Sequence, residues 1–116
     1  MEEIFKKYPL LKDQNVSRET FIDFEIFLSM LQQINEEINI ISKETAKNKA
    51  IRERHIVDSA QIIDFVDLNH NIITDIGTGG GMPGVILSII IKSLKKTCKV
   101  NLYEKNKRNL ASNPLF

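Results

Sequence analysis

All five glycines of this 116-residue chain lie within eight consecutive positions, residues 77–84 (GTGGGMPG). The five residues before them, Ile72 to Ile76, are mostly apolar and β-branched and predict a short buried strand. The residues after them, Val85 to Leu94, are apolar enough for a buried helix, and Pro83 suits its first turn because a missing N–H costs nothing there. Lys99 to Glu104 alternates and predicts a second strand that ends in an acid. This order predicts a β-α-β unit with parallel strands, an α/β fold.

The glycine loop has the chemistry of a nucleotide-cofactor site. Glycines let the backbone adopt positive φ and let a ligand approach where a Cβ would block it, next to the N–H groups at the start of a helix. Two spacings fit the same letters. The pattern D-x-G-x-G-x-G, beginning at Asp75, is typical of S-adenosylmethionine enzymes, and G-x-G-x-x-G, beginning at Gly79, is the dinucleotide pattern. Glu104 fits either pattern, since an acid that ends the second strand can accept hydrogen bonds from ribose hydroxyls.

Two details favour the methyl donor. Asp75 lies two residues before the first glycine, where its carboxylate can brace the loop and approach the cationic methionine end, whereas a dinucleotide fold normally has an apolar residue there. The dinucleotide pattern would also leave Gly77 and Thr78 as extra residues in the loop. A glycine-rich turn that binds no ligand is the remaining alternative.

The N-terminal half predicts a helix that packs on a core. From Ser17, a plausible N-cap, apolar residues recur at intervals of three and four along one stripe. Aromatic residues at this spacing indicate a helix that docks on the core more often than one that binds a partner. The stripe consists of Phe21, Phe24, Phe27, Leu28, Leu31, Ile34 and Ile38.

A polar segment, Ser42 to Arg54, follows this helix and carries more positive than negative charge. Such a segment is either a solvated helix face or a patch that contacts phosphates, because Lys and Arg supply most of the sequence-independent affinity for RNA. Its basic residues are Lys43, Lys47, Lys49, Arg52 and Arg54. The next segment, Ile56 to Val66, predicts a short helix.

Composition limits the possible partners. The formal net charge of +1 gives no overall attraction to nucleic acid or anionic lipid, so RNA binding requires a local patch. Cys98 is the single cysteine, which excludes an intramolecular disulfide and a multi-cysteine metal site. The start lacks an apolar segment, and the run from Val85 to Ile91 is too short to cross a membrane. We therefore expect a cytoplasmic protein that binds neither metal nor membrane.

Three segments together resemble one family. Residues 75–84 (DIGTGGGMPG) resemble the first motif of the ribosomal RNA small-subunit methyltransferase G family, also called glucose-inhibited division protein B. Residues 54–59 (RHIVDS) resemble the signature of that family before the first strand, and residues 38–42 (INIIS) resemble its Asn-Leu-Thr-like segment. The resemblance extends from about Ile34 to Lys107, and three ordered motifs are more specific than the glycine loop alone.

The resemblance implies a fold and an activity. The fold would be an N-terminal helical cap, residues 1–71, followed by the β-α-β start of a Rossmann-like class I S-adenosylmethionine methyltransferase sheet, residues 72–108, and a divergent tail, residues 109–116. The activity would be methylation of N7 of a guanine in 16S ribosomal RNA, with S-adenosylmethionine as cofactor and the RNA or the small ribosomal subunit as partner. No catalytic residue is assigned, because transfer to N7 requires positioning rather than a strong base.

The resemblance also assigns roles to residues. Gly77 and Met82 would line the cofactor, Gly79 and Gly81 would let the backbone approach it, and Glu104 would bind its ribose. With Asp75, the expected cofactor-binding set is Asp75, Gly77, Gly79, Gly81, Met82 and Glu104. The expected RNA-facing set on the cap is Lys49, Arg52, Arg54 and His55. For His55 a role in helix packing or capping is the alternative.

The end of the sequence departs from the family pattern. Gly80 stands where the family often has proline, which is a mild change. After Arg108 the family would continue through a helix and several strands, whereas residues 109–116 show no amphipathic continuation. We therefore expect a truncated N-terminal part of such an enzyme, marginally folded and without activity of its own. The alternative functions are a nicotinamide- or flavin-dinucleotide-binding fragment and a small RNA- or protein-interaction module.

Overall fold

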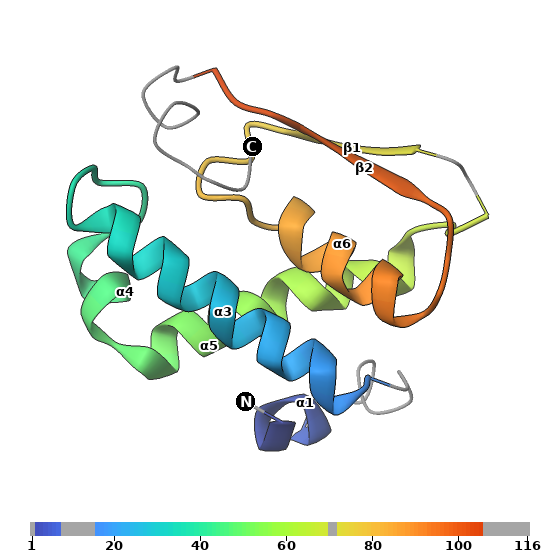
Figure 1. Ribbon diagram of the computed structural model, residues 1–116, viewed down its shortest axis with the longest axis horizontal. Coiled ribbons are helices and arrows are strands. Elements are labelled where there is room, and N and C mark those ends of the chain that lie inside the picture. The colour runs from blue at the N-terminus through green and yellow to red at the C-terminus, as the bar shows by residue number, and fades with distance from the viewer. Residues whose placement is uncertain (1, 8–15, 70–71, 106–116) are drawn as a thin grey trace.

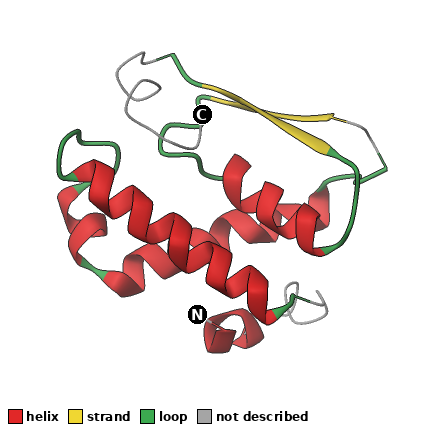
Figure 2. Ribbon diagram, viewed as in Figure 1, coloured by secondary structure: helices red, strands yellow, loops and turns green. Residues whose placement is uncertain are grey.

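A computed structural model describes residues 2–7, 16–69 and 72–105, so the expected tail lies outside the described residues. Figures 1 and 2 show two strands along one side of the molecule and the helices on the other. None of the described helices is long and apolar enough to span a membrane. In chain order the elements are α1 (Glu2–Lys7), α3 (Arg18–Asn35), α4 (Lys43–Lys47), α5 (Lys49–Ala60), the 3-10 helix η1 (Gln61–Phe65), β1 (Ile72–Ile76), α6 (Gly84–Ser93) and β2 (Lys99–Tyr103).

The two strands form a parallel pair, which confirms the predicted β-α-β unit. β1 and β2 pair in register from Ile72 with Lys99 to Ile76 with Tyr103, and α6 makes the connection between them. The prediction that β1 is a buried strand is wrong for one of its faces. Ile72 and Ile76 are 57% and 83% exposed, because the described helices cover only the opposite face of the sheet.

The predicted apolar stripe packs in or against the core from Phe21 to Leu31, α3 ends at Asn35 and therefore before the last predicted stripe residue, Ile38, and the predicted N-cap is confirmed. Ser17 Oγ accepts a hydrogen bond from the N–H of Thr20 at 3.4 Å. The fully buried Phe24 and Leu31 of α3 lie in one cluster with Ile56 of α5 and Ile86 of α6. This single core therefore contains residues from both sides of the expected boundary between residues 71 and 72.

The polar segment forms two helices, and the predicted helix from Ile56 in fact begins at Lys49. Asn48 separates α4 from α5 and caps α5, since its Oδ1 accepts hydrogen bonds from the N–H groups of Ala50 at 3.0 Å and Ile51 at 3.3 Å. This local capping starts the helix seven residues before the apolar pattern. The last turn becomes the 3-10 helix η1.

The glycine loop lies directly against α3. A Cβ at Gly80 would stand 2.8 Å from Ile40 Cγ2 and 3.0 Å from Leu31 Cδ1. A Cβ at Gly81 would stand 3.4 Å from Phe27 Cε2, so neither position leaves free room for a side chain on this side.

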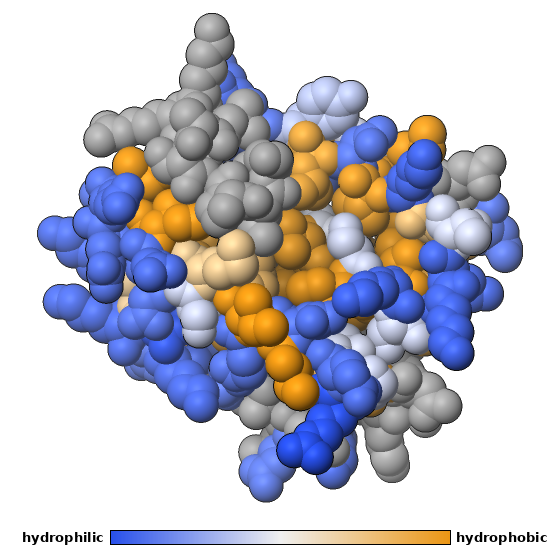
Figure 3. Space-filling view, viewed as in Figure 1, coloured by the Kyte–Doolittle hydropathy of each residue, from blue (hydrophilic) through white to orange (hydrophobic). Residues whose placement is uncertain are grey.

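Figure 3 shows apolar side chains gathered along the middle of the face it presents, with hydrophilic side chains at the left and lower rim, where α4 and α5 lie in Figure 1.

One hydrogen bond ties β1 to the start of α6. Asp75 Oδ2 accepts the N–H of Gly84, the first residue of α6, at 2.9 Å. The N–H groups of the first helical turn have no partner within the helix, so a carboxylate there satisfies one of them and interacts favourably with the helix dipole. Asp75 thus fixes where α6 begins relative to the strand.

We expect Asp75→Ala to destabilise the chain by about 1–2 kcal/mol, as the loss of a helix cap does. Asp75→Asn keeps an oxygen that can accept the N–H of Gly84 and should cost less. Urea unfolding in the absence of any ligand measures both changes. Asp58→Ala removes the same charge from an exposed position of α5 and is the control. Equal stability of Asp75→Ala and Asp58→Ala would show that the bond does not hold α6.

Candidate cofactor site

The start of the glycine loop is fastened to the end of the second strand. The N–H groups of Gly77 and Thr78 both donate to the carbonyl oxygen of Tyr103, at 2.8 and 3.1 Å. The N–H of Gly81 donates to the carbonyl oxygen of Thr78 at 2.9 Å and closes a turn. The loop therefore has a defined shape and lies beside the residue that precedes Glu104.

The backbone of the loop has the positive φ that the sequence indicated. Gly77, Gly79 and Gly81 have φ of +74°, +57° and +102°, which residues with a side chain rarely adopt. A Cβ at Gly77 would meet nothing within 4 Å, and one at Gly79 would lie 3.7 Å from Glu104 Oε2. The side-chain-free backbone of Gly77 and Gly79 therefore lies close to the carboxylate of Glu104. Both are at the end of the sheet where the parallel strands have their carboxyl ends.

This arrangement fits a ligand that carries ribose hydroxyls. The open space at Gly77 admits a ligand to the backbone, and the carboxylate of Glu104 can accept hydrogen bonds from hydroxyl groups. The residues present are thus compatible with the nucleoside part of S-adenosylmethionine. The same features would suit the ribose of a dinucleotide.

Two other members of the expected cofactor set have structural contacts. Asp75 is engaged with the N–H of Gly84, which agrees with a bracing role. Met82 is partly buried and packs against the core cluster, and its peptide bond to Pro83 is cis. Contact of Asp75 or Met82 with a cofactor stays a prediction.

Two residues of this region were absent from the expected set. A Cβ at Gly84 would collide with Leu102 Cδ2, so its lack of a side chain lets α6 pack closely on β2. The signal was present in the sequence, because the third glycine of G-x-G-x-x-G serves close helix–strand packing. Thr78 is 3% exposed, and its Oγ1 makes no hydrogen bond within the described part of the chain. A single polar residue between two glycines was its only signal.

The expected RNA-facing residues do not all share one face, because Arg54 points away from the others. Arg52 donates from Nη1 to the carbonyl oxygens of Thr45, at 3.4 Å, and of Ala46, so its charge lies at the end of α4. Lys49 lies 3.7 Å from Glu53 Oε1 and is 69% exposed. Arg54 is exposed, and residues two apart on a helix point in different directions, so Arg54 does not join Arg52.

His55 is exposed in the middle of α5. It is therefore not a core residue and does not lie at a helix end, so the alternative of a packing or capping histidine is wrong. Its contact with RNA stays a prediction. The described residues contain no group of three or more His, Cys, Asp or Glu side chains placed to hold a metal ion.

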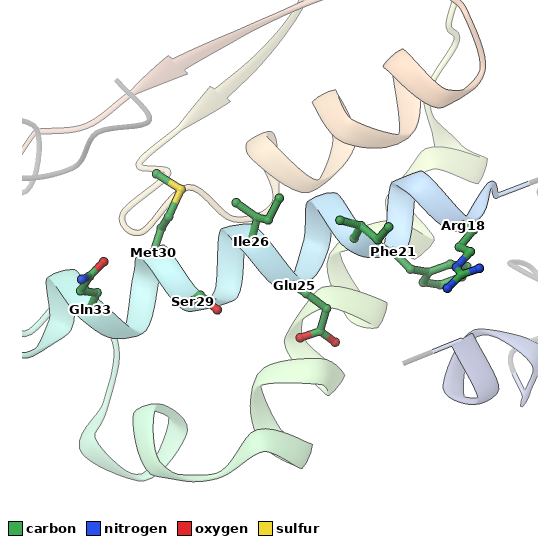
Figure 4. A pocket seen from close by; sticks show the side chains of 8 residues that line it. Arg18, Phe21, Glu25, Ile26, Ser29, Met30 and Gln33 are labelled. Carbon is green, nitrogen blue, oxygen red and sulfur yellow. The ribbon is translucent and has the colours of Figure 1, made fainter.

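Two grooves lie along the helices of the N-terminal half. One, of about 520 Å³, follows the outer face of α3, where Ile22 and Ile26 are 50% and 53% exposed. Figure 4 shows Ile26 and Met30 pointing to the side of α3 on which α6 lies, and Glu25 pointing the other way. Its lining residues are Arg18, Phe21, Ile22, Glu25, Ile26, Ser29, Met30 and Gln33. The second groove lies between the end of α3 and α4.

Comparison with known proteins gives a consistent result. A family model described as GidB, rRNA small subunit methyltransferase G, matches residues 21–111. A protein named ribosomal RNA small subunit methyltransferase G from Pelagibacter ubique is 76% identical over 106 residues, which are 91% of this chain and 50% of that protein. Proteins of the same name from Orientia tsutsugamushi and Bartonella henselae are 44% and 42% identical over 65% and 84% of this chain, and over 37% and 43% of their own length.

The chain thus spans half the length of the Pelagibacter relative and less of the other two. No solved structure matches it. The family model covers the greater part of the sequence, including the glycine loop and Glu104. The chain therefore belongs to the rRNA small subunit methyltransferase G family.

Proposed function

We propose that this chain is the cofactor-binding part of an enzyme that transfers a methyl group from S-adenosylmethionine to N7 of a guanine in 16S ribosomal RNA. One observation supports S-adenosylmethionine as the cofactor. The carboxylate of Glu104 lies beside the backbone of Gly79, and the space at Gly77 is open. Membership of the family and the names of the relatives support the RNA substrate. A Rossmann-like class I sheet and a cytoplasmic location are parts of the same proposal.

The residues of the chain act by holding and orienting. When bound, S-adenosylmethionine supplies a methyl group on a positively charged sulfur. Gly77 and Gly79 admit the ligand to the backbone, and Glu104 accepts hydrogen bonds from its ribose hydroxyls. Asp75 holds α6 in place and thereby the loop that precedes it. Because N7 of guanine already carries a lone pair, the task of the protein is to bring it into line with the methyl group.

One observation favours a dinucleotide as the second candidate. Gly84 packs α6 on β2 as the third glycine of the G-x-G-x-x-G pattern does. Close helix–strand packing is useful to any β-α-β unit, however, and Asp75 holds the place where a dinucleotide fold has an apolar residue. Membership of a methyltransferase family supports the methyl donor over the dinucleotide.

Calorimetric titration of the 116-residue chain tests the cofactor. We expect saturable binding of S-adenosylhomocysteine, the product form of the cofactor, and none of NAD or FAD at the same concentrations. The carboxylate and the glycine loop suit the nucleoside, and Asp75 fits the pattern of the methyl donor. Binding of NAD or FAD in preference to S-adenosylhomocysteine would contradict the proposal and favour the alternative function, a dinucleotide-binding fragment.

Glu104→Ala should weaken the binding of S-adenosylhomocysteine by about 1.5–3 kcal/mol, or about 10- to 150-fold in Kd, as expected for hydrogen bonds to a charged group. The same titration measures the change. Glu37→Ala, an exposed acid just beyond α3, removes the same charge and should leave the affinity unchanged. Equal affinities of the two variants would remove Glu104 from the site.

A further inference from the structure

The groove between α3 and α4 has the chemistry of a phosphate-binding surface. Its volume is about 470 Å³, and its lining is polar except for Ala46. Lys43 and Lys47 are four residues apart on α4 and therefore lie on the same side of that helix. Glu36 is the one acid among the lining residues, which leaves an excess of positive charge. The lining consists of Gln32, Asn35, Glu36, Asn39, Lys43, Ala46 and Lys47.

The orientation of the Asn35 amide is set by the backbone. Asn35 is 9% exposed, and its Oδ1 accepts hydrogen bonds from the N–H groups of Ile40 at 2.7 Å and Ile41 at 2.9 Å. Only the oxygen of an amide side chain can accept two N–H groups, so the nitrogen cannot exchange places with it. Because Asn35 also lines the groove, the group that it has left to offer a ligand is its amino group, a donor held in a fixed direction.

The donors of the groove suit a ligand that has only acceptors. The ammonium groups of Lys43 and Lys47 and the amino group of Asn35 are all donors, and phosphate oxygens are all acceptors. Side chains of Lys and Asn are among those that contact phosphates in nucleic-acid complexes, where they set the position of the protein rather than read sequence. A phosphodiester backbone, whose phosphate oxygens are acceptors only, is one ligand that matches these donors.

The groove and the glycine loop touch the same turn of the chain. Asn39 lines the groove, and the next residue, Ile40, approaches Gly80 so closely that a Cβ there would lie 2.8 Å from Ile40 Cγ2. The side-chain oxygen of Asn35 holds this turn by accepting the N–H groups of Ile40 and Ile41. A nucleic acid in the groove would thus be separated from the glycine loop by one short segment.

We infer that this groove binds the phosphate backbone of the ribosomal RNA substrate, with Lys43, Lys47 and the amino group of Asn35 as its donors. The inference rests on the proposed function for the identity of the RNA. It moves the RNA contact from the expected set on α5 to the junction of α3 and α4. Figure 1 shows that junction at the end of α3 farthest from α1.

Two variants of the 116-residue chain test the groove independently, because each removes different donors. Asn35→Asp keeps an oxygen for the N–H groups of Ile40 and Ile41 but replaces the amino donor with a second carboxylate oxygen. Lys43→Gln with Lys47→Gln removes both positive charges and leaves Asn35 intact. The matched control is Lys96→Gln with Lys99→Gln, which changes the net charge equally at two exposed positions elsewhere.

Filter binding to unmodified small-subunit ribosomal RNA, transcribed in vitro, measures the effect. We expect each groove variant to lose about tenfold or more in affinity, as for charge-assisted bonds, and the control to retain that of the unaltered chain. The double lysine variant should also lower the slope of log K against log salt by about 1.4–1.8, the value for two phosphate contacts. Binding of S-adenosylhomocysteine should be unchanged in all variants.

Three results would overturn the inference. The first is no binding of RNA by the unaltered chain, and the second is an equal loss in the control, which would indicate general charge attraction. The third is RNA affinity in both groove variants equal to that of the unaltered chain. Should Asn35→Asp fail to fold, as seen in its unfolding curve, the lysine pair decides. If the unaltered chain binds RNA but not S-adenosylhomocysteine, the proposed function fails, and the RNA result alone still decides the groove.

Discussion

Contact between the glycine loop and helix α3 joins the sheet to the helical part of the molecule. Gly80 carries no side chain, so the loop backbone reaches Leu31 and Ile40 at distances that a Cβ would not allow, and Gly81 lies beside Phe27. The same loop begins on β2, through the carbonyl oxygen of Tyr103, and ends at α6, whose first N–H is held by Asp75. One segment of eight residues therefore positions the strands, the crossover helix and the cap relative to each other.

This dependence explains why the glycines cannot be regarded as ligand contacts alone. Gly77 and Gly79 have positive φ, and they face open space and Glu104, which is consistent with a role toward a ligand. Gly80 and Gly84 instead make room for Ile40 and Leu102, a packing role. A substitution in the loop can act on binding, on packing or on both, so ligand affinity and stability must be measured together.

For the binding of an anionic partner, the local arrangement of the basic side chains matters more than the net charge of the chain. The chain has a formal net charge of only +1, and part of its basic segment is used internally. Arg52 binds the carbonyl groups at the end of α4, and Lys49 lies near Glu53. Lys43 and Lys47 share a groove with the oriented amide of Asn35, so a small excess of charge is combined there with a fixed donor. An adjacent turn links this groove to the glycine loop.

Most of the elements and their order follow from local signals in the sequence, although α1 and the division of the polar segment into α4 and α5 were not predicted. The glycine cluster, the apolar stripe of α3 with its cap at Ser17, and the parallel β-α-β unit were all predictable from spacing and backbone freedom. The start of α5 was missed because one residue, Asn48, caps it ahead of the apolar pattern. Three features became known from the folded structure alone: one strand face is exposed, Asp75 holds Gly84, and Asn35 and the lysines of α4 line one groove. These features depend on which segments distant in sequence pack together, and neither the direction of a side chain nor the partner that satisfies it is encoded in residue spacing.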